Sequence, residues 1–221
     1  MTDRPRTGRL VDIWRAYWRC PLGTRLRVVG RYLLCPFGAL LKEFPREGRV
    51  LDVGCGDGLL LYLLIREPNP CARECVGIDV AVNKIANARD LQLDNVKFHP
   101  ADVADMPSEY FDCVSITDVL YLLPISSWAI FLKQCIRALR KGGLLIVKET
   151  IDRPRWKFLI AYMQELLSIY VTRMTKGDHP HLESLDFYQE SIRAAGAEVF
   201  QTKRLDAGFP YPHVLLLARK R

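Results

Sequence analysis

The sequence lacks several features that would assign it at once to a class of protein. No segment reaches the roughly 18 uninterrupted apolar residues that a membrane-spanning helix requires. The first residues, Met-Thr-Asp-Arg-Pro-Arg, are not followed by an apolar core, so we expect no secretory signal. The seven cysteines form no Cys-x-x-Cys pair, and no histidine spacing suggests a metal ligand. We therefore expect a cytoplasmic protein without a bound metal, and peripheral contact with a membrane stays open.

What the sequence does contain fits one globular chain with an unusual beginning. It has 221 residues, of which 49% are hydrophobic and 26% are charged. The net charge of +7 arises within residues 1–49, where eleven Lys and Arg face four acids. Residues 1–9 are predicted to be disordered. Residues 10–41 place aromatic and aliphatic side chains between arginines at three- and four-residue spacing, which predicts two or three basic amphipathic helices.

From residue 49 onward, the pattern alternates between short apolar strands and helices. Strands are predicted at 49–53, 75–79, 96–99, 111–117 and 144–149, and helices at 59–66, 81–91 and 126–139. Residues 141–143 are predicted to form a turn before the fifth strand. Helices of this length between strands imply right-handed crossovers and a parallel sheet, hence an α/β fold. We divide the chain into a helical arm over 1–48 and a second unit over 49–221.

The end of the chain departs from this alternation. Residues 152–186 form a predicted helical insertion, which includes the apolar stretch 158–170. A helix over 187–195, stopped by Gly196, is then followed by a closing hairpin of strands at 198–205 and 213–220.

A glycine-rich segment follows the first predicted strand. Gly54, Gly56 and Gly58 would let the backbone turn sharply and let a ligand approach the main chain, although a purely structural turn needs the same residues. The dinucleotide-binding fingerprint requires a third glycine where Leu59 stands, and the P-loop ending Gly-Lys-Ser/Thr is absent. The sequence therefore disfavours both of these nucleotide-binding classes.

Three acidic residues follow the predicted strands that come next. Asp79 ends the second strand and could accept hydrogen bonds from both hydroxyls of a ribose, although an aspartate at this point could also cap a helix. Asp102, after the third strand, could accept from an exocyclic amine, while Val103 offers its N–H to a ring nitrogen. Asp118 ends the fourth strand, at the edge where open α/β sheets bind ligands.

Taken in order, these motifs resemble the class I S-adenosylmethionine (SAM)-dependent methyltransferases of the small-molecule or lipid type. The resemblance covers residues 48–150 in detail and the closing hairpin in outline. It implies a Rossmann-like, doubly wound, mostly parallel seven-stranded sheet with an antiparallel last strand, and SAM as cofactor. The cofactor-binding residues that follow from it are Asp52, Gly54, Cys55, Gly56, Asp57, Gly58, Asp79, Val80, Asp102, Val103, Asp118 and Val119.

The methyl acceptor is less well defined by the sequence. Methyl transfer from a sulfonium needs a base only when the acceptor must lose a proton, and the candidates are Asp118, Tyr121, His179 and His181. The two histidines fit an ordinary solvated loop equally well. Residues 155–176 are apolar and aromatic with basic ends, which suits either a cap helix packed on the core or a wall for a hydrophobic acceptor.

The basic N-terminal arm is compatible with more than one kind of binding partner. Residues 10–41 could settle on an anionic membrane, gaining about 1 kcal/mol per basic residue near the surface, and this favours a small lipophilic acceptor. A pI near 9.1 also fits a nucleic-acid methyltransferase, but no RNA-binding module is visible. A non-catalytic binding protein on the same fold is the third possibility.

Overall fold

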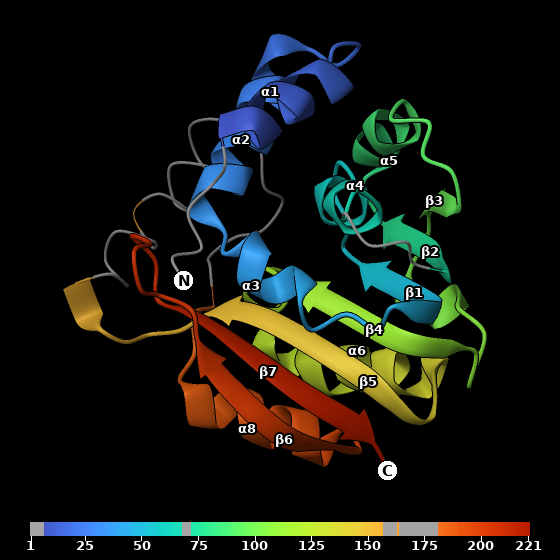
Figure 1. Ribbon diagram of the computed structural model, residues 1–221. Coiled ribbons are helices and arrows are strands. Elements are labelled where there is room, and N and C mark those ends of the chain that lie inside the picture. Colours follow the sequence, from blue (N-terminus) through green and yellow to red (C-terminus); the bar gives the residue numbers. More distant parts are fainter. Residues whose placement is uncertain (1–6, 68–71, 157–162, 164–180) are drawn as a thin grey trace.

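The computed structural model describes residues 7–67, 72–156, 163 and 181–221, and its centre is a seven-stranded sheet (Figure 1). The strand order is β3-β2-β1-β4-β5-β7-β6. The first five strands run parallel, whereas β7 is antiparallel to both of its neighbours, β5 and β6. This arrangement confirms the predicted Rossmann-like sheet. The strands are β1 (Glu47–Val53), β2 (Ala72–Asp79), β3 (Val96–Pro100), β4 (Phe111–Thr117), β5 (Leu139–Thr150), β6 (Ala197–Arg204) and β7 (His213–Lys220).

Helices cover both faces of the sheet (Figure 1). One face carries α1 (Thr7–Ala16), α2 (Leu22–Leu34), α3 (Phe37–Leu41), α4 (Leu59–Ile65) and α5 (Val82–Arg89). The other face carries α6 (Ile125–Ala138) and α8 (Leu185–Ala194). Two short 3₁₀ turns, η1 (Val103–Asp105) and η2 (Leu120–Leu122), follow β3 and β4. Within the described residues, no helix is long and apolar enough to cross a bilayer.

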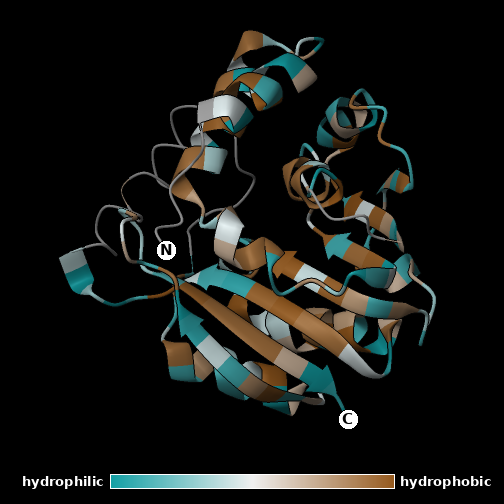
Figure 2. Ribbon diagram, in the orientation of Figure 1, coloured by the Kyte–Doolittle hydropathy of each residue, from teal (hydrophilic) through white to brown (hydrophobic). Residues whose placement is uncertain are grey.

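The sheet separates two hydrophobic clusters, and apolar side chains dominate its central strands (Figure 2). On one side, residues 59–64 of α4 are buried together with Tyr17, Val28 and Tyr32 of the N-terminal helices. The predicted arm therefore shares a hydrophobic core with the sheet. On the other side, Trp128 stacks on Tyr188 with ring centroids 5.0 Å apart.

Three details of the described residues differ from the sequence-based expectations. Helix α1 begins at Thr7, so residues 7–9 are helical rather than disordered. Strand β1 begins at Glu47, two residues before the predicted start at 49. Residues 141–143, predicted as a turn, belong to β5. The strand continues through them because of a bulge, which is marked by a register shift against β4 and a φ of +71° at Gly142. Residues 158–170 of the insertion, Met163 excepted, lie outside the described residues.

Candidate functional site

The loop after β1 needs its glycines for two different reasons. Gly54, Gly56 and Gly58 all have positive φ, at 72°, 56° and 82°. A Cβ on Gly54 would lie 2.5 Å from Cγ2 of Val119, and one on Gly58 would lie 2.9 Å from the ring of Phe98. A Cβ on Gly56 would meet nothing nearer than 3.5 Å. Packing therefore requires glycine at 54 and 58, whereas Gly56 presents bare backbone to the adjoining cavity.

Asp79 is fixed at the end of β2 by two backbone groups. Its Oδ2 accepts a hydrogen bond from the Gly56 N–H at 2.9 Å, and its Oδ1 accepts one from the Ala81 N–H at 2.8 Å. Each carboxylate oxygen keeps a further lone pair for another donor. The carboxylate is therefore oriented in advance as a pair of acceptors, an arrangement suited to the two neighbouring hydroxyls of a ribose.

A cavity of about 630 Å³ lies along the carboxyl ends of the strands and contains most of the predicted residues. The predicted residues that line it are Gly54, Gly56, Asp57, Asp79, Val80, Asp102, Val103, Asp118, Val119 and Tyr121. Asp52, Cys55 and Gly58 are not among the lining residues. The lining also includes the apolar side chains of Leu122, Leu123, Phe131 and Leu182. One cavity thus combines polar groups around the glycine loop, its polar part, with apolar side chains from η2, α6 and Leu182, its apolar part.

Asp52 lies behind this cavity. It is buried, and its Oδ1 accepts a hydrogen bond from the Ser115 hydroxyl at 2.7 Å. Burial raises the pKa of Asp52 to about 7, although the Ser115 hydrogen bond and the Arg31 cation oppose the shift. The side chain joins β1 to β4, and its role in cofactor binding stays a prediction.

Asp118 is held by two cations in a left-handed backbone conformation with φ of 59°. Its Oδ1 lies 2.5 Å from Nζ of the buried Lys148, and its Oδ2 lies 3.9 Å from Nη2 of Arg31. Burial alone would raise the pKa of Asp118, but the positive charges of Lys148 and Arg31 outweigh it and lower the pKa. Asp118 is therefore ionised and a weak proton acceptor at neutral pH.

Two arginines of α2, which the sequence analysis did not select, also reach the cavity. Arg27 forms an ion pair with Asp57 at 2.8 Å, and Asn87 donates to the same carboxylate at 2.9 Å. Arg31 donates to the Thr117 carbonyl at 3.1 Å, and its Nη1 is the group closest to the open side of Gly56. The i, i+4 spacing of the two arginines placed them on one helical face and was the available signal.

The other predicted residues lie as follows. The Asp102 carboxylate accepts from the Ala104 N–H at 2.8 Å and so caps η1, which positions both Asp102 and Val103 at the cavity. His181 is not among the lining residues, but its N–H donates to the Tyr121 carbonyl at 2.8 Å. His179 lies outside the described residues.

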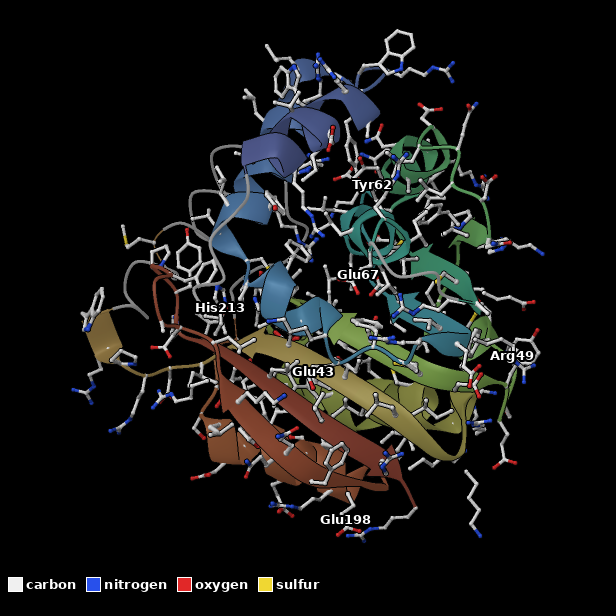
Figure 3. The ribbon with its side chains drawn as sticks, in the orientation of Figure 1. Glu43, Arg49, Tyr62, Glu67, Glu198 and His213 are labelled. Atoms are coloured by element: carbon white, nitrogen blue, oxygen red, sulfur yellow. The ribbon has the colours of Figure 1, made fainter. Side chains whose placement is uncertain are left out.

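His213 lies at the start of β7 (Figure 3). It is buried, and its Nε2 donates to the Leu34 carbonyl at 2.8 Å, because a carbonyl can only accept. This contact ties the end of α2 to the sheet at the apolar part of the cavity.

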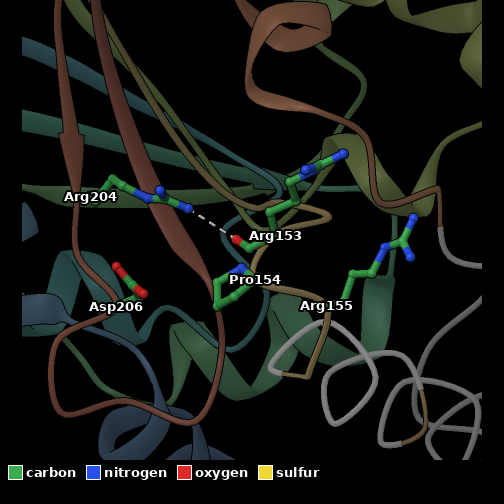
Figure 4. Close-up of a pocket in the computed structure, with 5 residues that line it drawn as sticks. All are labelled: Arg153, Pro154, Arg155, Arg204 and Asp206. Carbon is green, nitrogen blue, oxygen red and sulfur yellow. Dashed lines mark hydrogen bonds between the residues drawn. The ribbon is translucent and has the colours of Figure 1, made fainter.

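A second hollow, of about 460 Å³, lies elsewhere on the molecule (Figure 4). It is lined by Arg153, Pro154, Arg155, Arg204 and Asp206, none of which lines the larger cavity. Arg204 donates to the Arg153 carbonyl at 3.1 Å across this hollow. The glycine loop and Asp79 therefore lie in the larger cavity only.

The strand order, the glycine loop after β1 and the acidic end of β2 together define the class I SAM-dependent methyltransferases, whose methyl donor is SAM. The chain belongs to the methyltransferase domain family, whose model matches residues 29–202. The match begins inside α2, so it includes Arg31 as well as the sheet.

Individual proteins similar to this chain agree with that family. The ubiquinone biosynthesis O-methyltransferase of Xylella fastidiosa is 32% identical over 162 residues, covering 70% of this chain and 59% of that protein. The demethylmenaquinone methyltransferase of Staphylococcus aureus is 28% identical over 173 residues, covering 74% of this chain and 69% of that protein. The chain thus spans about three fifths of the Xylella protein.

A solved structure shares the same fold. The crystal structure of the SAM-dependent methyltransferase SibL in its apo form superposes with a TM-score of 0.69 at 24% identity, covering 90% of this chain and 58% of that one.

Proposed function

We propose that this protein transfers the methyl group of SAM to a lipophilic, quinone-type aromatic acceptor. The observation that carries this proposal is that one cavity of about 630 Å³ combines polar groups such as Asp79 with apolar side chains such as Phe131. A cavity of this size suits a cofactor together with a small ring system. The acceptor ring would lie next to the donor without crossing solvent.

The polar part fits SAM through residues already in position. Asp79 would accept from the ribose hydroxyls, and Asp102 with Val103 would contact the adenine. The bare backbone at Gly56 and the guanidinium of Arg31 would receive the methionine part, because a cation beside open backbone suits a carboxylate. When bound, SAM supplies an electrophilic methyl group on a sulfonium.

The apolar part suits an aromatic acceptor. Leu122, Leu123, Phe131 and Leu182 offer the kind of surface on which a hydrophobic ring loses its hydration shell. The names of the curated relatives, a ubiquinone biosynthesis O-methyltransferase and a demethylmenaquinone methyltransferase, place both of them in quinone chemistry. A hydroquinone or phenol is accordingly the acceptor class that we propose.

Catalysis would depend chiefly on alignment. Holding two reactants in line at contact distance can supply roughly 7–11 kcal/mol of a barrier. Asp118 is neutralised by Lys148, so its proposed role is to shape the site with its fixed charge rather than to remove a proton. Tyr121, which lines the cavity, is the better candidate for contacting an acceptor hydroxyl, and His181 would support it through the Tyr121 carbonyl.

The structure gives less support to a nucleic-acid acceptor. Arg27 and Arg31 face Asp57 and Asp118 at the cavity, so two cations of the basic arm are already partnered within the protein. Fewer positive charges are therefore available for a phosphate backbone. The intact glycine loop and Asp79 argue in the same way against a non-catalytic protein that has lost the donor site.

The test is transfer of label from methyl-labelled SAM to a hydroquinone carrying a short isoprenoid tail. We expect label in the organic extract, and we expect the Phe131→Ala variant to reduce kcat/KM at least about tenfold through lost ring contacts. The matched control is Phe200→Ala, because Phe200 is 52% exposed on β6 and is not among the cavity-lining residues. Label entering tRNA instead, or equal effects of both variants, would contradict the proposal.

A further inference from the structure

Helix α2 carries a hydrophobic stripe that the fold leaves uncovered. Leu22, Leu26 and Leu33 are 62%, 58% and 41% exposed. Their spacing of four and seven residues places them on one side of the helix. The positions that α2 buries against the domain are different ones, namely Thr24, Val28 and Tyr32. Trp18, four residues before Leu22 in the chain, is 66% exposed as well. We call Trp18, Leu22, Leu26 and Leu33 the α2 stripe.

Unpaired positive charge accompanies this stripe. Helices α1 and α2 and their connection hold six arginines and one acid, Asp12, over residues 7–34. Arg27 and Arg31 are partnered at the cavity, and the guanidinium of Arg25 lies 3.8 Å from the ring centroid of Trp14, which leaves Arg9, Arg15 and Arg19 to act outward. The guanidinium of Arg19 lies 5.2 Å from the ring centroid of Trp18, so cation and aromatic ring occupy the same place on the surface. Hydrophobic and hydrophilic residues are interleaved along α1 and α2 (Figure 2).

We propose that the α2 stripe and its arginines dock this protein on an anionic lipid bilayer. Exposed leucines with an interfacial tryptophan can enter the boundary between headgroups and acyl chains, while arginines contact anionic headgroups. A phosphate backbone would use the arginines but would leave the leucines in water, so the stripe itself favours lipid over nucleic acid. The described helices are too short or too polar to span a bilayer, so docking is the mode of contact that they permit.

The position of α2 links this surface to the cavity. The helix that bears Leu22 and Leu26 also carries Arg27, Val28, Arg31 and Leu34, all of which line the cavity. A bilayer on the stripe would therefore lie against the outer side of the helix that covers the site. This gives a lipophilic acceptor a short route from the membrane. The route rests on the proposed function, whereas docking itself does not.

The test is co-sedimentation with vesicles of phosphatidylcholine alone and with vesicles containing one third phosphatidylglycerol. We expect binding to the anionic vesicles, weakened by salt, and at least about tenfold less binding for the Leu22→Asp/Leu26→Asp double variant. The matched control is Ile130→Asp, because Ile130 is 63% exposed on α6, on the other face of the sheet. That control should bind vesicles within about twofold of wild type.

Two further measurements keep the result unambiguous. SAM binding by calorimetry should be unchanged in the double variant, which shows that loss of docking is not loss of folding. Should that variant fail to fold, Arg15→Gln/Arg19→Gln changes only exposed side chains and should lower anionic-vesicle binding by about tenfold at low salt.

Several results would overturn the proposal. One is a wild-type protein that ignores anionic vesicles while still binding SAM, which would leave the proposed function intact. A second is a double variant that binds vesicles as well as wild type. A third is a wild-type dimer that becomes monomeric in the double variant, since the stripe would then belong to a second copy of the chain.

Discussion

Removing the ion pair between Arg27 and Asp57 should detach α2 from the glycine loop. Two nitrogens of Arg27 contact both carboxylate oxygens, at 3.1, 2.9 and 2.8 Å. The side chains are 29% and 9% exposed, so water screens the pair only in part. The Tyr17 hydroxyl donates to the Asp57 carbonyl at 2.8 Å, so residue 57 is held both by α2 and by the turn that follows α1.

The expected magnitude follows from this geometry. A bidentate, charge-assisted contact of this kind gives a coupling of roughly 1–3 kcal/mol. The Arg27→Ala change alone should lower the free energy of unfolding by about 2–3 kcal/mol, because among the described residues only the Asn87 amide would still donate to Asp57 from a side chain. The Asp57→Asn change preserves the shape of the side chain and removes its charge.

The assay is a double-mutant cycle measured by urea unfolding, with SAM affinity measured by calorimetry on the same four proteins. We expect a coupling above about 1 kcal/mol and weaker SAM binding in both single variants, because the loop at Gly56 loses its support. A coupling within about 0.3–0.5 kcal/mol of zero, together with unchanged SAM affinity, would refute the reasoning.

Three other predictions concern the walls of the cavity. Gly54→Ala should lower the free energy of unfolding by about 1–3 kcal/mol, because φ is +72° and the new Cβ would meet Val119. A variant that melts at the same temperature as wild type would contradict this. Arg31→Ala should weaken SAM binding about tenfold or more by calorimetry, and unchanged affinity would remove Arg31 from the site. Burial, and then the charge of Asp118, raise the pKa of Glu149 to about 8, although the N–H groups of Val119 and Leu120 oppose the shift. In the unfolded chain this carboxyl has a pKa of about 4.3. Its ionisation therefore opposes folding, and the free energy of unfolding falls as the pH rises from about 4 to about 8. The Glu149→Gln variant should therefore become more stable than wild type between pH 5 and 9, by on the order of a few kcal/mol. If the free energy of unfolding depended on pH in the same way in both proteins, the raised pKa of Glu149 would be contradicted.

The sheet and the cofactor side of the cavity could be predicted because their signals are local. Asp79 directly ends an apolar run, and in a parallel sheet that position lies beside the loop after β1. Glycines at 54, 56 and 58 likewise reveal the need for positive φ within one short segment. The bulge that extends β5 through Gly142 could not be foreseen, since it depends on how β4 pairs with β5.

The contribution of the N-terminal helices was missed because it depends on tertiary contacts. From the sequence alone, arginines on an amphipathic helix could face either solvent or a membrane. The fold shows instead that Arg27 and Arg31 are turned toward Asp57 and Asp118. The pairing of Asp118 with Lys148 had a local signal, namely a lysine within the apolar strand Leu-Leu-Ile-Val-Lys. A lysine with a side chain only 1% exposed requires a partner, and Asp118 is that partner.

The central claim is that Asp79 and the glycine loop hold the methyl donor, and calorimetric titration of SAM tests it most directly. The prediction is clear binding to wild type, at least about tenfold weaker binding to Asp79→Ala, and unchanged binding to the exposed control Asp186→Ala. Folded wild-type protein that gives no binding heat at several temperatures, or an Asp79→Ala variant that binds SAM like wild type, would contradict it.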